Sequence, residues 1–195
     1  MVRTPHGPNR PGQVRIYTTN PGKVREIRAL LEPRGIRVAW SRRRLVEIQG
    51  DSLDEVARCK LNSVSPRPGE LSLVEDSGLF VHSLGGFPGV YSAYVYRTLG
   101  LAGILRLVRG KDRSATFRCV VGLRRGSEVL LARGAVTGSL TRRARGALGF
   151  GFDPIFVPRG CSESFAEMPA GVKNRYSHRG RAFRALLRAL PKVFP

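Results

Sequence analysis

Residues 14–40, VRIYTTNPGKVREIRALLEPRGIRVAW, decide the fold of this chain. The first of them, 14–18, are mostly apolar or β-branched and predict a short strand, and apolar residues then recur at helical spacing across 24–31. Pro33 ends the helical pattern, and residues 36–40 predict a second strand. A strand, a helix and a strand in succession favour an α/β fold, whose ligand sites lie at the ends of strands.

The rest of the chain continues this alternation. Further helices are predicted at 53–64, 99–108 and 177–190, and further strands at 71–75, 114–124 and 128–137. The short connection 125–127 is typical of an antiparallel hairpin. Because no segment repeats and 195 residues suffice for one substantial core, we expect a single domain over 14–195. Residues 1–13, which hold three prolines and two glycines, are predicted to form a flexible arm.

Composition excludes several classes of protein. A hydrophobic fraction of 42% is too high for a disordered chain, and no apolar run approaches the roughly 20 residues that cross a bilayer. The first residues lack the apolar stretch of a secretory signal, so we expect a cytoplasmic protein with no membrane partner. Cys59, Cys119 and Cys161 lack the paired spacing of a zinc or redox motif, which indicates ordinary reduced thiols.

The chain is strongly basic. Its 34 lysines and arginines against 14 acidic residues give a formal charge of +20, which attracts polyanions and phosphorylated molecules. The basic residues are spread along the chain, with short runs at 42–44 and 142–143, and a solvated surface is the simpler interpretation. Five of them are lysines, at positions 23, 60, 111, 173 and 192. Because lysine is a compact point charge and arginine a planar fork, Lys23, Lys60 and Lys173 are candidate ligand positions.

A turn between the first strand and the first helix is suited to phosphate. It offers hydroxyl groups, backbone amides and one ammonium group, from Thr18, Thr19, Asn20, Pro21, Gly22 and Lys23. Unpaired N–H groups and the dipole at a helix N-terminus favour anions, so a triphosphate tail fits this turn. The spacing is not that of a Walker loop, and taken alone the stretch is also an ordinary strand-to-helix turn.

Two adjacent carboxylates, Glu75 and Asp76, are predicted to end a strand whose earlier residues are apolar. Because neighbouring residues on a strand point to opposite sides, one carboxylate faces a cleft more directly than the other. Magnesium binds through one or two carboxylates and substrate phosphates, and Glu47 is a third candidate ligand. Solvated acids are the alternative, above all for Glu75. Lys60 lies on an apolar helical stripe. Its side chain either extends along the stripe so that the ammonium group reaches solvent, or points into a cleft where the ammonium group binds an anion.

The third cluster combines aromatic rings with polar groups. Phe150 and Phe152 flank Gly151 and precede Asp153, so one ring can stack on a base, although phenylalanines near glycines often belong to a core. Further along, His178 and Arg179 occupy the first turn of a helix that Ser177 is predicted to cap. Their donors suit a carbonyl group on a base, whereas an amino group at the same place would leave them unpaired.

These ordered motifs resemble one family, the non-canonical purine nucleoside triphosphate pyrophosphatases, also called the inosine triphosphatase or Ham1-like family. The resemblance extends over nearly everything from Val14 to Leu190. The motifs that carry it are T-x-N-x-x-K at 18–23, EDSGL at 75–79 continuing to GGFPG at 85–89, GFGFDP at 149–154, and Lys173-Asn174 with Ser177-His178-Arg179.

The resemblance implies hydrolysis of the triphosphates of inosine, deoxyinosine and xanthosine (ITP, dITP and XTP) to the monophosphate and pyrophosphate, with Mg²⁺ as cofactor. It also implies an elongated single α/β domain around a mixed, twisted β-sheet flanked by helices, with an active-site cleft at strand ends, and a homodimer. By similarity, the turn 18–23 binds phosphates, Glu47 and Asp76 hold magnesium, and Asp76 accepts the proton of the attacking water. The implied substrate contacts are Lys60, Ser77 and Lys173, with a base pocket of Phe150, Gly151, Phe152 and Asp153, and His178 and Arg179 on the six-oxo edge.

Two residues depart from the family pattern, since Thr19 stands where glycine is common and Phe152 where tyrosine or tryptophan is frequent.

Two rival functions follow from the residues. The net charge fits a basic nucleic-acid-binding protein, although no RNP, helix-turn-helix or zinc motif is present, so no specific nucleic-acid partner is expected. A related pyrophosphatase for odd pyrimidine nucleotides would keep the chemistry and change the base pocket.

Overall fold

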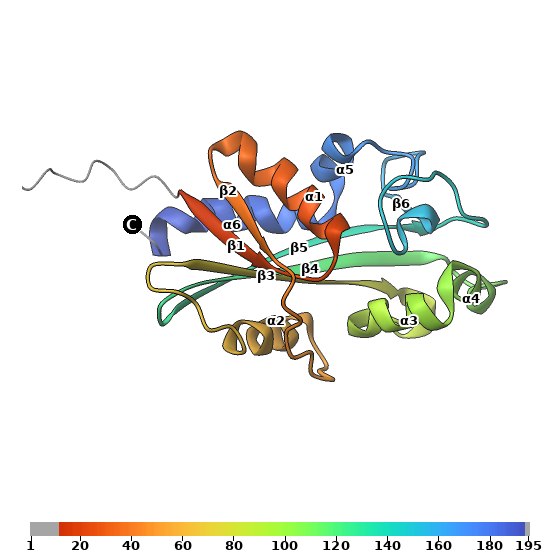
Figure 1. Ribbon diagram of the computed structural model, residues 1–195. Coiled ribbons are helices and arrows are strands. Elements are labelled where there is room, and N and C mark those ends of the chain that lie inside the picture. Colours follow the sequence, from red (N-terminus) through yellow and green to blue (C-terminus); the bar gives the residue numbers. More distant parts are fainter. Residues whose placement is uncertain (1–11, 194–195) are drawn as a thin grey trace, which may run out of the picture.

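The computed structural model describes residues 12–193 and contains one mixed β-sheet of six strands, in the order β2-β1-β3-β4-β5-β6. The strands are β1 Gln13–Tyr17, β2 Arg37–Ser41, β3 Leu71–Val81, β4 Ser114–Arg125, β5 Glu128–Leu140 and β6 Phe156–Pro158. Strand β1 runs parallel to both β2 and β3, and the pairs from β3 to β6 are antiparallel. The long strands β3, β4 and β5 give the molecule its elongated shape (Figure 1).

Helices cover both faces of this sheet. They are α1 Pro21–Leu31, α2 Leu53–Asn62, α3 Ser92–Thr98, α4 Gly100–Leu107, α5 Ala170–Tyr176 and α6 His178–Val193. Figure 1 shows α1, α5 and α6 on one side of the sheet and α2 on the other, with α3 and α4 beside the far end of β3. In the described part of the chain, no helix is long and apolar enough to cross a membrane.

Apolar side chains form a core on each side of the sheet. Val24 and Ile27 of α1 pack with Phe183 of α6 against β1 and β4, and Leu61 of α2 packs with Val74 on the opposite face. A third cluster fills the space between β3, β4, α4 and the segment around β6. These cores fix α1, α2 and α6 relative to the end of β1, where the candidate site lies.

The predicted strand, helix and strand at the start of the chain are confirmed, because β1, α1 and β2 follow in order and the strands pair in parallel. Strand β1 begins one residue earlier than predicted, at Gln13. The predicted flexible arm 1–13 otherwise lies outside the described residues, apart from exposed Gly12. The hairpin between β4 and β5 is also confirmed, with a connection of Gly126 and Ser127.

The predicted end of the third strand was wrong. Strand β3 continues beyond Glu75 to Val81, because β4 pairs with it from Ser72 to Val81. Its parallel neighbour β1 pairs with it only as far as Leu73, however. The strand end that forms the site is therefore that of β1, and the two carboxylates lie on β3 just beyond it.

Candidate active site

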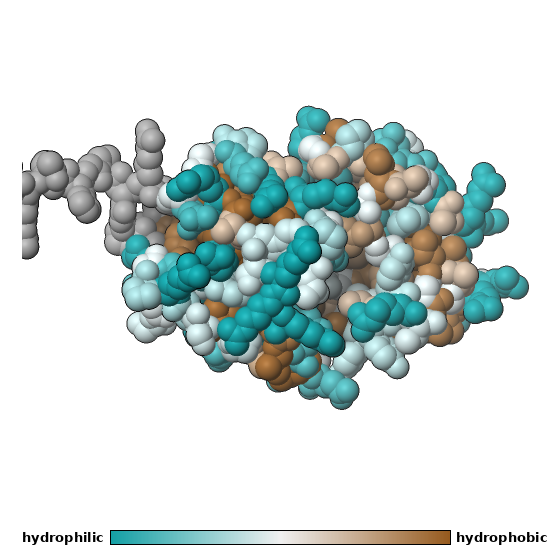
Figure 2. Space-filling view, viewed as in Figure 1, coloured by the Kyte–Doolittle hydropathy of each residue, from teal (hydrophilic) through white to brown (hydrophobic). Residues whose placement is uncertain are grey.

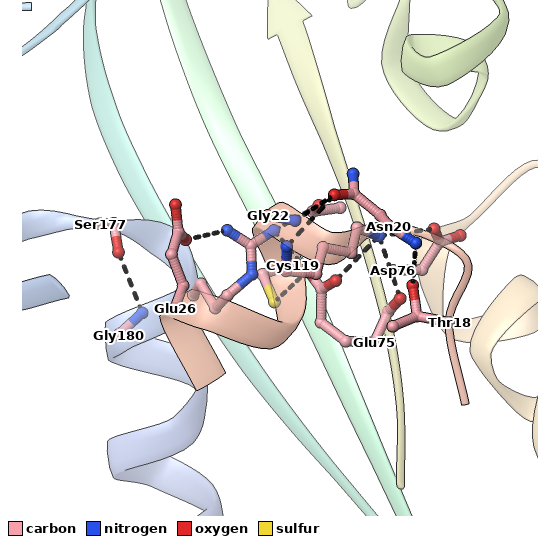
Figure 3. Close-up of polar contacts among 12 residues, drawn as sticks. Thr18, Asn20, Gly22, Glu26, Glu75, Asp76, Cys119, Ser177 and Gly180 are labelled. Carbon is pink, nitrogen blue, oxygen red and sulfur yellow. Dashed lines mark hydrogen bonds and ion pairs between the residues drawn. The ribbon is translucent and has the colours of Figure 1, made fainter. Parts of the chain in front are cut away.

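The phosphate turn lies where β1 gives way to α1. The Asn20 side chain caps the helix, since its Oδ1 accepts hydrogen bonds from the backbone N–H groups of Gly22 (2.8 Å) and Lys23 (3.2 Å). The Asn20 N–H in turn donates to Thr18 Oγ1 at 3.1 Å (Figure 3). Much of the hydrogen-bonding capacity of the turn is thus used by its own side chains, which makes its shape rigid.

Asp76 lies opposite two lysines. Its Oδ1 accepts a hydrogen bond from Lys60 Nζ at 3.2 Å and lies 3.9 Å from Lys23 Nζ. The same Lys60 ammonium is 2.8 Å from Glu47 Oε1, which belongs to an irregular segment between β2 and α2. Lys60 is buried within this carboxylate pair, so its side chain faces the cleft and does not extend along the helix surface. The two carboxylates expected to bind metal therefore converge on one cation.

Glu75, the other carboxylate of the pair, is fully buried. Its Oε1 accepts from Arg179 Nη2 (3.0 Å) and from the thiol of Cys119 (3.2 Å), and its Oε2 lies 2.8 Å from Lys23 Nζ. The expectation of a solvated acid at this position is thus wrong. Glu75 instead joins Lys23 of the phosphate turn to Arg179 of α6, from the opposite side of β3 to Asp76.

A second buried carboxylate, Glu26 of α1, joins the two C-terminal motifs. Its Oε1 is 2.6 Å from Lys173 Nζ and its Oε2 is 2.5 Å from Arg179 Nη1 (Glu26 is labelled in Figure 3). Lys173 also contacts Asp153 Oδ2 at 2.6 Å, and that oxygen accepts from the Phe150 N–H at 2.7 Å. This network connects the segment around Phe150 to α1 and α6.

Burial and neighbouring charges set the pKa values of these acids apart. Burial opposes ionisation of both Glu75 and Glu26, but neighbouring cations outweigh this effect and hold both pKa values below the usual range. These cations are Arg179 and Lys23 for Glu75, and Arg179 and Lys173 for Glu26. Burial raises the pKa of Asp76, although Lys60 and Lys23 act in the opposite direction. Of the adjacent acids on β3, Asp76 is thus the one poised to accept a proton.

The aromatic residues separate into two groups. Phe150 lies below the ammonium of Lys173 (5.1 Å) and the guanidinium of Arg179 (5.3 Å), and a Cβ at Gly22 would overlap its ring. Phe152 is only 4% exposed and belongs to the core beside α4. Of these two rings, Phe150 is therefore the one available for stacking on a ligand.

The N-terminal end of α6 contributes His178 and Arg179, and the Ser177 Oγ accepts from the Gly180 N–H as predicted for a cap. The imidazole of His178 stacks on Phe117 at 4.6 Å, and burial, reinforced by Arg179 and Lys173, holds its pKa well below the usual value. Arg179 Nη2 donates to Ser77 Oγ at 3.1 Å. Within residues 12–193, His178 Nδ1 and Arg179 Nε are buried without a hydrogen-bond partner.

These residues surround a cleft of about 1580 Å³. Most of the predicted site residues line it, namely Thr18, Thr19, Asn20, Lys23, Glu47, Lys60, Asp76, Ser77, Phe150, Gly151, Phe152, Asp153, His178 and Arg179. Pro21 and Gly22 lie in the first turn of α1 and, with Lys173, are not part of the lining. Lys173, which is 2% exposed, supports the cleft from beneath through Asp153 and Glu26.

The donor set fits a divalent cation of the magnesium type. No group of three or more His, Cys, Asp or Glu side chains converges on one point in the described chain. Magnesium does not need such a cage, since it binds through one or two carboxylates and completes its shell with water and phosphate oxygens. Glu47 and Asp76 offer two carboxylates of this kind, and both contact the Lys60 ammonium in this structure.

Sequence reasoning missed Glu26 and undervalued Glu75. The sequence does indicate that Glu26 is buried, since Leu30 follows four residues later and lies on the same side of α1. Glu75 follows the buried Leu73 by two residues, which places both on one face of β3.

The chain is similar to one protein family and to several named proteins over most of its length. The model of the Ham1 family matches residues 14–189. A protein from Thermococcus kodakarensis named dITP/XTP pyrophosphatase is 49% identical over 170 residues, which are 87% of this chain and 92% of the relative. A protein of the same name from Ignicoccus hospitalis is 45% identical over 181 residues, 91% of this chain and 96% of the relative.

Solved structures agree with this assignment. The HAM1 protein from Coxiella burnetii superposes with a TM-score of 0.79 at 28% identity, covering 92% of this chain and 98% of that structure. The nucleoside-triphosphatase, or dITP/XTP pyrophosphatase, from Mycobacterium abscessus superposes with a TM-score of 0.64 at 32% identity, covering 90% and 98%. With a family match that spans nearly all the described residues and a fold shared with solved members, the chain belongs to the Ham1 family.

Proposed function

We propose that this chain hydrolyses the triphosphates of deaminated purines, dITP, ITP and XTP, to the monophosphate and pyrophosphate. The observation that carries the proposal is the cleft in which Asp76, a carboxyl group with a raised pKa, faces Lys60 and Lys23 at the end of β1. Relatives named dITP/XTP pyrophosphatase that align over most of the chain support the same activity.

The reaction is a displacement at the α-phosphorus. A water oxygen forms the new bond to phosphorus, its proton passes to the Asp76 carboxylate, and the bond to the bridging oxygen breaks so that pyrophosphate leaves. Lys23 and Lys60 place positive charge beside the phosphates, and the Thr18–Lys23 turn orients the tail. Glu47 and Asp76 are the proposed ligands of Mg²⁺, which supplies Lewis-acid stabilisation of phosphate charge when bound.

Selection of the base rests on the opposite end of the cleft. Phe150 offers a ring face, and Arg179 Nε is a buried donor without a partner in the described residues. An arginine nitrogen donates and never accepts, so a purine with an oxygen at position six satisfies it and one with an amino group does not. We therefore propose that His178 and Arg179 discriminate against adenine. Ser77 supports Arg179 through a hydrogen bond, and Asp153 supports the adjoining Phe150.

A cytoplasmic homodimer belongs to the same proposal, with residues 14–195 as its catalytic domain. Exposed apolar residues in and next to α3, among them Phe87, Tyr91 and Tyr94, line the rim of the cleft and provide a surface suited to self-association. Light scattering of the purified chain determines the mass in solution, and a monomeric mass at micromolar concentration contradicts the dimer.

Product analysis tests the activity. The purified protein is incubated with magnesium and, in parallel, with inosine, guanosine and adenosine triphosphates. The expected result is inosine monophosphate and pyrophosphate from ITP, with adenosine triphosphate largely intact and no turnover after chelation. Release of orthophosphate, or equal attack on all three nucleotides, contradicts the proposal, and binding of random DNA or RNA without any turnover favours a nucleic-acid-binding function.

A further inference from the structure

The arginine run 42–44 leaves β2 directly beside the phosphate turn. Tyr17 and Ser41 are paired at the ends of β1 and β2, and the Thr18 N–H donates to the Ser41 carbonyl at 3.1 Å. The Trp40 indole N–H donates to the Thr18 carbonyl at 2.8 Å, which holds the two strand ends together. The run therefore begins next to Thr18 and leads along the cleft towards Glu47.

The three arginines of the run differ in their surroundings. The Arg42 guanidinium stacks over the Trp40 ring at 4.4 Å, and Arg42 is not part of the cleft lining. Arg43 and Arg44 are exposed and do line the cleft. Their guanidinium groups donate no hydrogen bond and form no ion pair with residues 12–193, although Arg44 acts electrostatically on the Glu47 carboxylate. Two cations thus face the cleft with donors available to a ligand.

The charge balance of the site shows why such cations matter. Four of its other basic groups, Lys23, Lys60, Lys173 and Arg179, are engaged by acids, since they contact Glu26, Glu47, Glu75, Asp76 and Asp153. Arg97 of α3 is the remaining basic residue of the lining. Within this network four cations face five carboxylates, so the network offers no net positive charge to a triphosphate, which carries several negative charges. The backbone donors of Gly22 and Lys23 are also occupied, by Asn20. The phosphate tail therefore needs further donors from outside this network.

We propose that Arg43 and Arg44 bind the terminal phosphates of the substrate, the part that leaves as pyrophosphate. The inference rests on the proposed function, which places the α-phosphorus beside Asp76. The base end of the cleft is formed by Phe150 and His178, and the contacts then run from Asp76 through Lys60 to Glu47, towards the arginines. A guanidinium fork matches a phosphate through two parallel hydrogen bonds, which a lysine does not provide.

The experiment compares a double variant, Arg43→Ala with Arg44→Ala, with a matched control, Arg142→Ala with Arg143→Ala. The control removes the same charge from another arginine run, whose residues are exposed and lie outside the cleft lining. The probes are inorganic pyrophosphate and inosine monophosphate, titrated by calorimetry in the presence of magnesium, and the kinetics of ITP hydrolysis. Melting temperatures of all three proteins verify folding.

The expected result is a loss of pyrophosphate affinity and a rise in KM for ITP of roughly tenfold in the Arg43/Arg44 variant, since charge-assisted hydrogen bonds at an exposed site are moderate in strength. Affinity for inosine monophosphate, which lacks the terminal phosphates, stays the same, and the control matches the wild type. The inference is overturned if wild type and variant bind pyrophosphate with equal affinity, or if the wild type does not bind pyrophosphate. It is also overturned if the variant loses affinity for inosine monophosphate as much as for pyrophosphate. A wild type that binds pyrophosphate without hydrolysing ITP contradicts only the proposed function.

Discussion

Glu75 and Asp76 are neighbours in sequence with opposite electrostatic surroundings. Glu75 is held ionised by Arg179 and Lys23 on one face of β3, whereas burial raises the pKa of Asp76 on the other. Paired carboxyl groups whose pKa values are driven apart commonly divide their tasks, one as a fixed charge and one as a proton acceptor. Glu75 is the fixed charge here, because it positions the ammonium group of Lys23 and the guanidinium group of Arg179.

Replacing Asp76 by Asn tests its role as proton acceptor. The amide keeps the shape of the carboxyl group but accepts no proton, so we expect kcat for ITP to fall by roughly 10²- to 10⁴-fold. Initial rates of pyrophosphate release measure this effect, and the melting temperature shows whether the variant folds. Wild-type turnover in a correctly folded variant would mean that another group accepts the proton.

Replacing Glu26 by Gln tests the buried network. The change leaves Lys173 and Arg179 without a shared counter-charge at buried positions, so we expect a loss of about 3–5 kcal/mol in unfolding free energy. The matched control is Glu32→Gln, whose carboxylate forms an exposed pair with Arg28 at 3.6 Å and should cost well under about 1 kcal/mol. Urea denaturation compares the two, and equal losses contradict the interpretation.

The sequence identifies most residues of the site because they occur in ordered motifs, but it does not reveal which partners hold them. Glu26 lies between basic residues on an amphipathic helix, where a surface position is the ordinary expectation. Its burial depends on Lys173 and Arg179, which are more than 140 residues away along the chain. The spacing of Glu26 and Leu30 places Glu26 on the apolar side of α1, but the long-range partners of its carboxylate cannot be read from a single sequence.

At the scale of elements, strand β3 shows how pairing overrides local signals. The triplet Asp76-Ser77-Gly78, which directly follows the predicted strand end at Glu75, consists of residue types that are common in turns. Strand β4 pairs through the triplet, and the ladder continues to Val81. Gly78 serves close packing here, because a Cβ at this position would overlap the backbone oxygen of Gly89. The turn-like residue types therefore reflect close approach of chain segments, which local propensity does not distinguish from a turn.

The contact of α6 with β5 depends on a second glycine. A Cβ at Gly134 would overlap the His178 carbonyl and the Ala182 N–H, so Gly134→Ala should displace the helix that carries His178 and Arg179. We expect a loss of roughly 1–3 kcal/mol in stability, typical of overpacking, together with a higher KM for ITP. Gly171→Ala on α5 is the control, since nothing lies near its Cβ and alanine favours a helix. A fully stable Gly134→Ala variant with wild-type KM would show that α6 does not need this close contact.

For the whole molecule, the charge of +20 is not concentrated in the site. Figure 2 shows hydrophilic side chains spread over the viewed face, with smaller apolar patches between them. The basic groups deep in the cleft are paired with carboxylates, and the surplus positive charge belongs mainly to exposed arginines. The surface thus attracts phosphorylated ligands at long range, and the paired groups of the cleft position them.

Global stability should depend on pH through His178. Burial, with Arg179 and Lys173, lowers its pKa in the folded state, so below about pH 6.5 the unfolded chain binds a proton that the folded chain does not. The unfolding free energy should therefore fall as the pH drops below 6.5, by about 1.4 kcal/mol per unit for this one group. The variant His178→Phe keeps a ring on Phe117 and removes the titration, so its stability should decline less. Asp76 and Asp153 have raised pKa values, so their protonation favours the folded state as the pH falls. Both residues are present in the wild type and in the His178→Phe variant, so they do not account for a difference between the two. Urea denaturation between pH 7.5 and about pH 5.5 measures both curves, and parallel curves would mean that His178 is protonated alike in the folded and unfolded states.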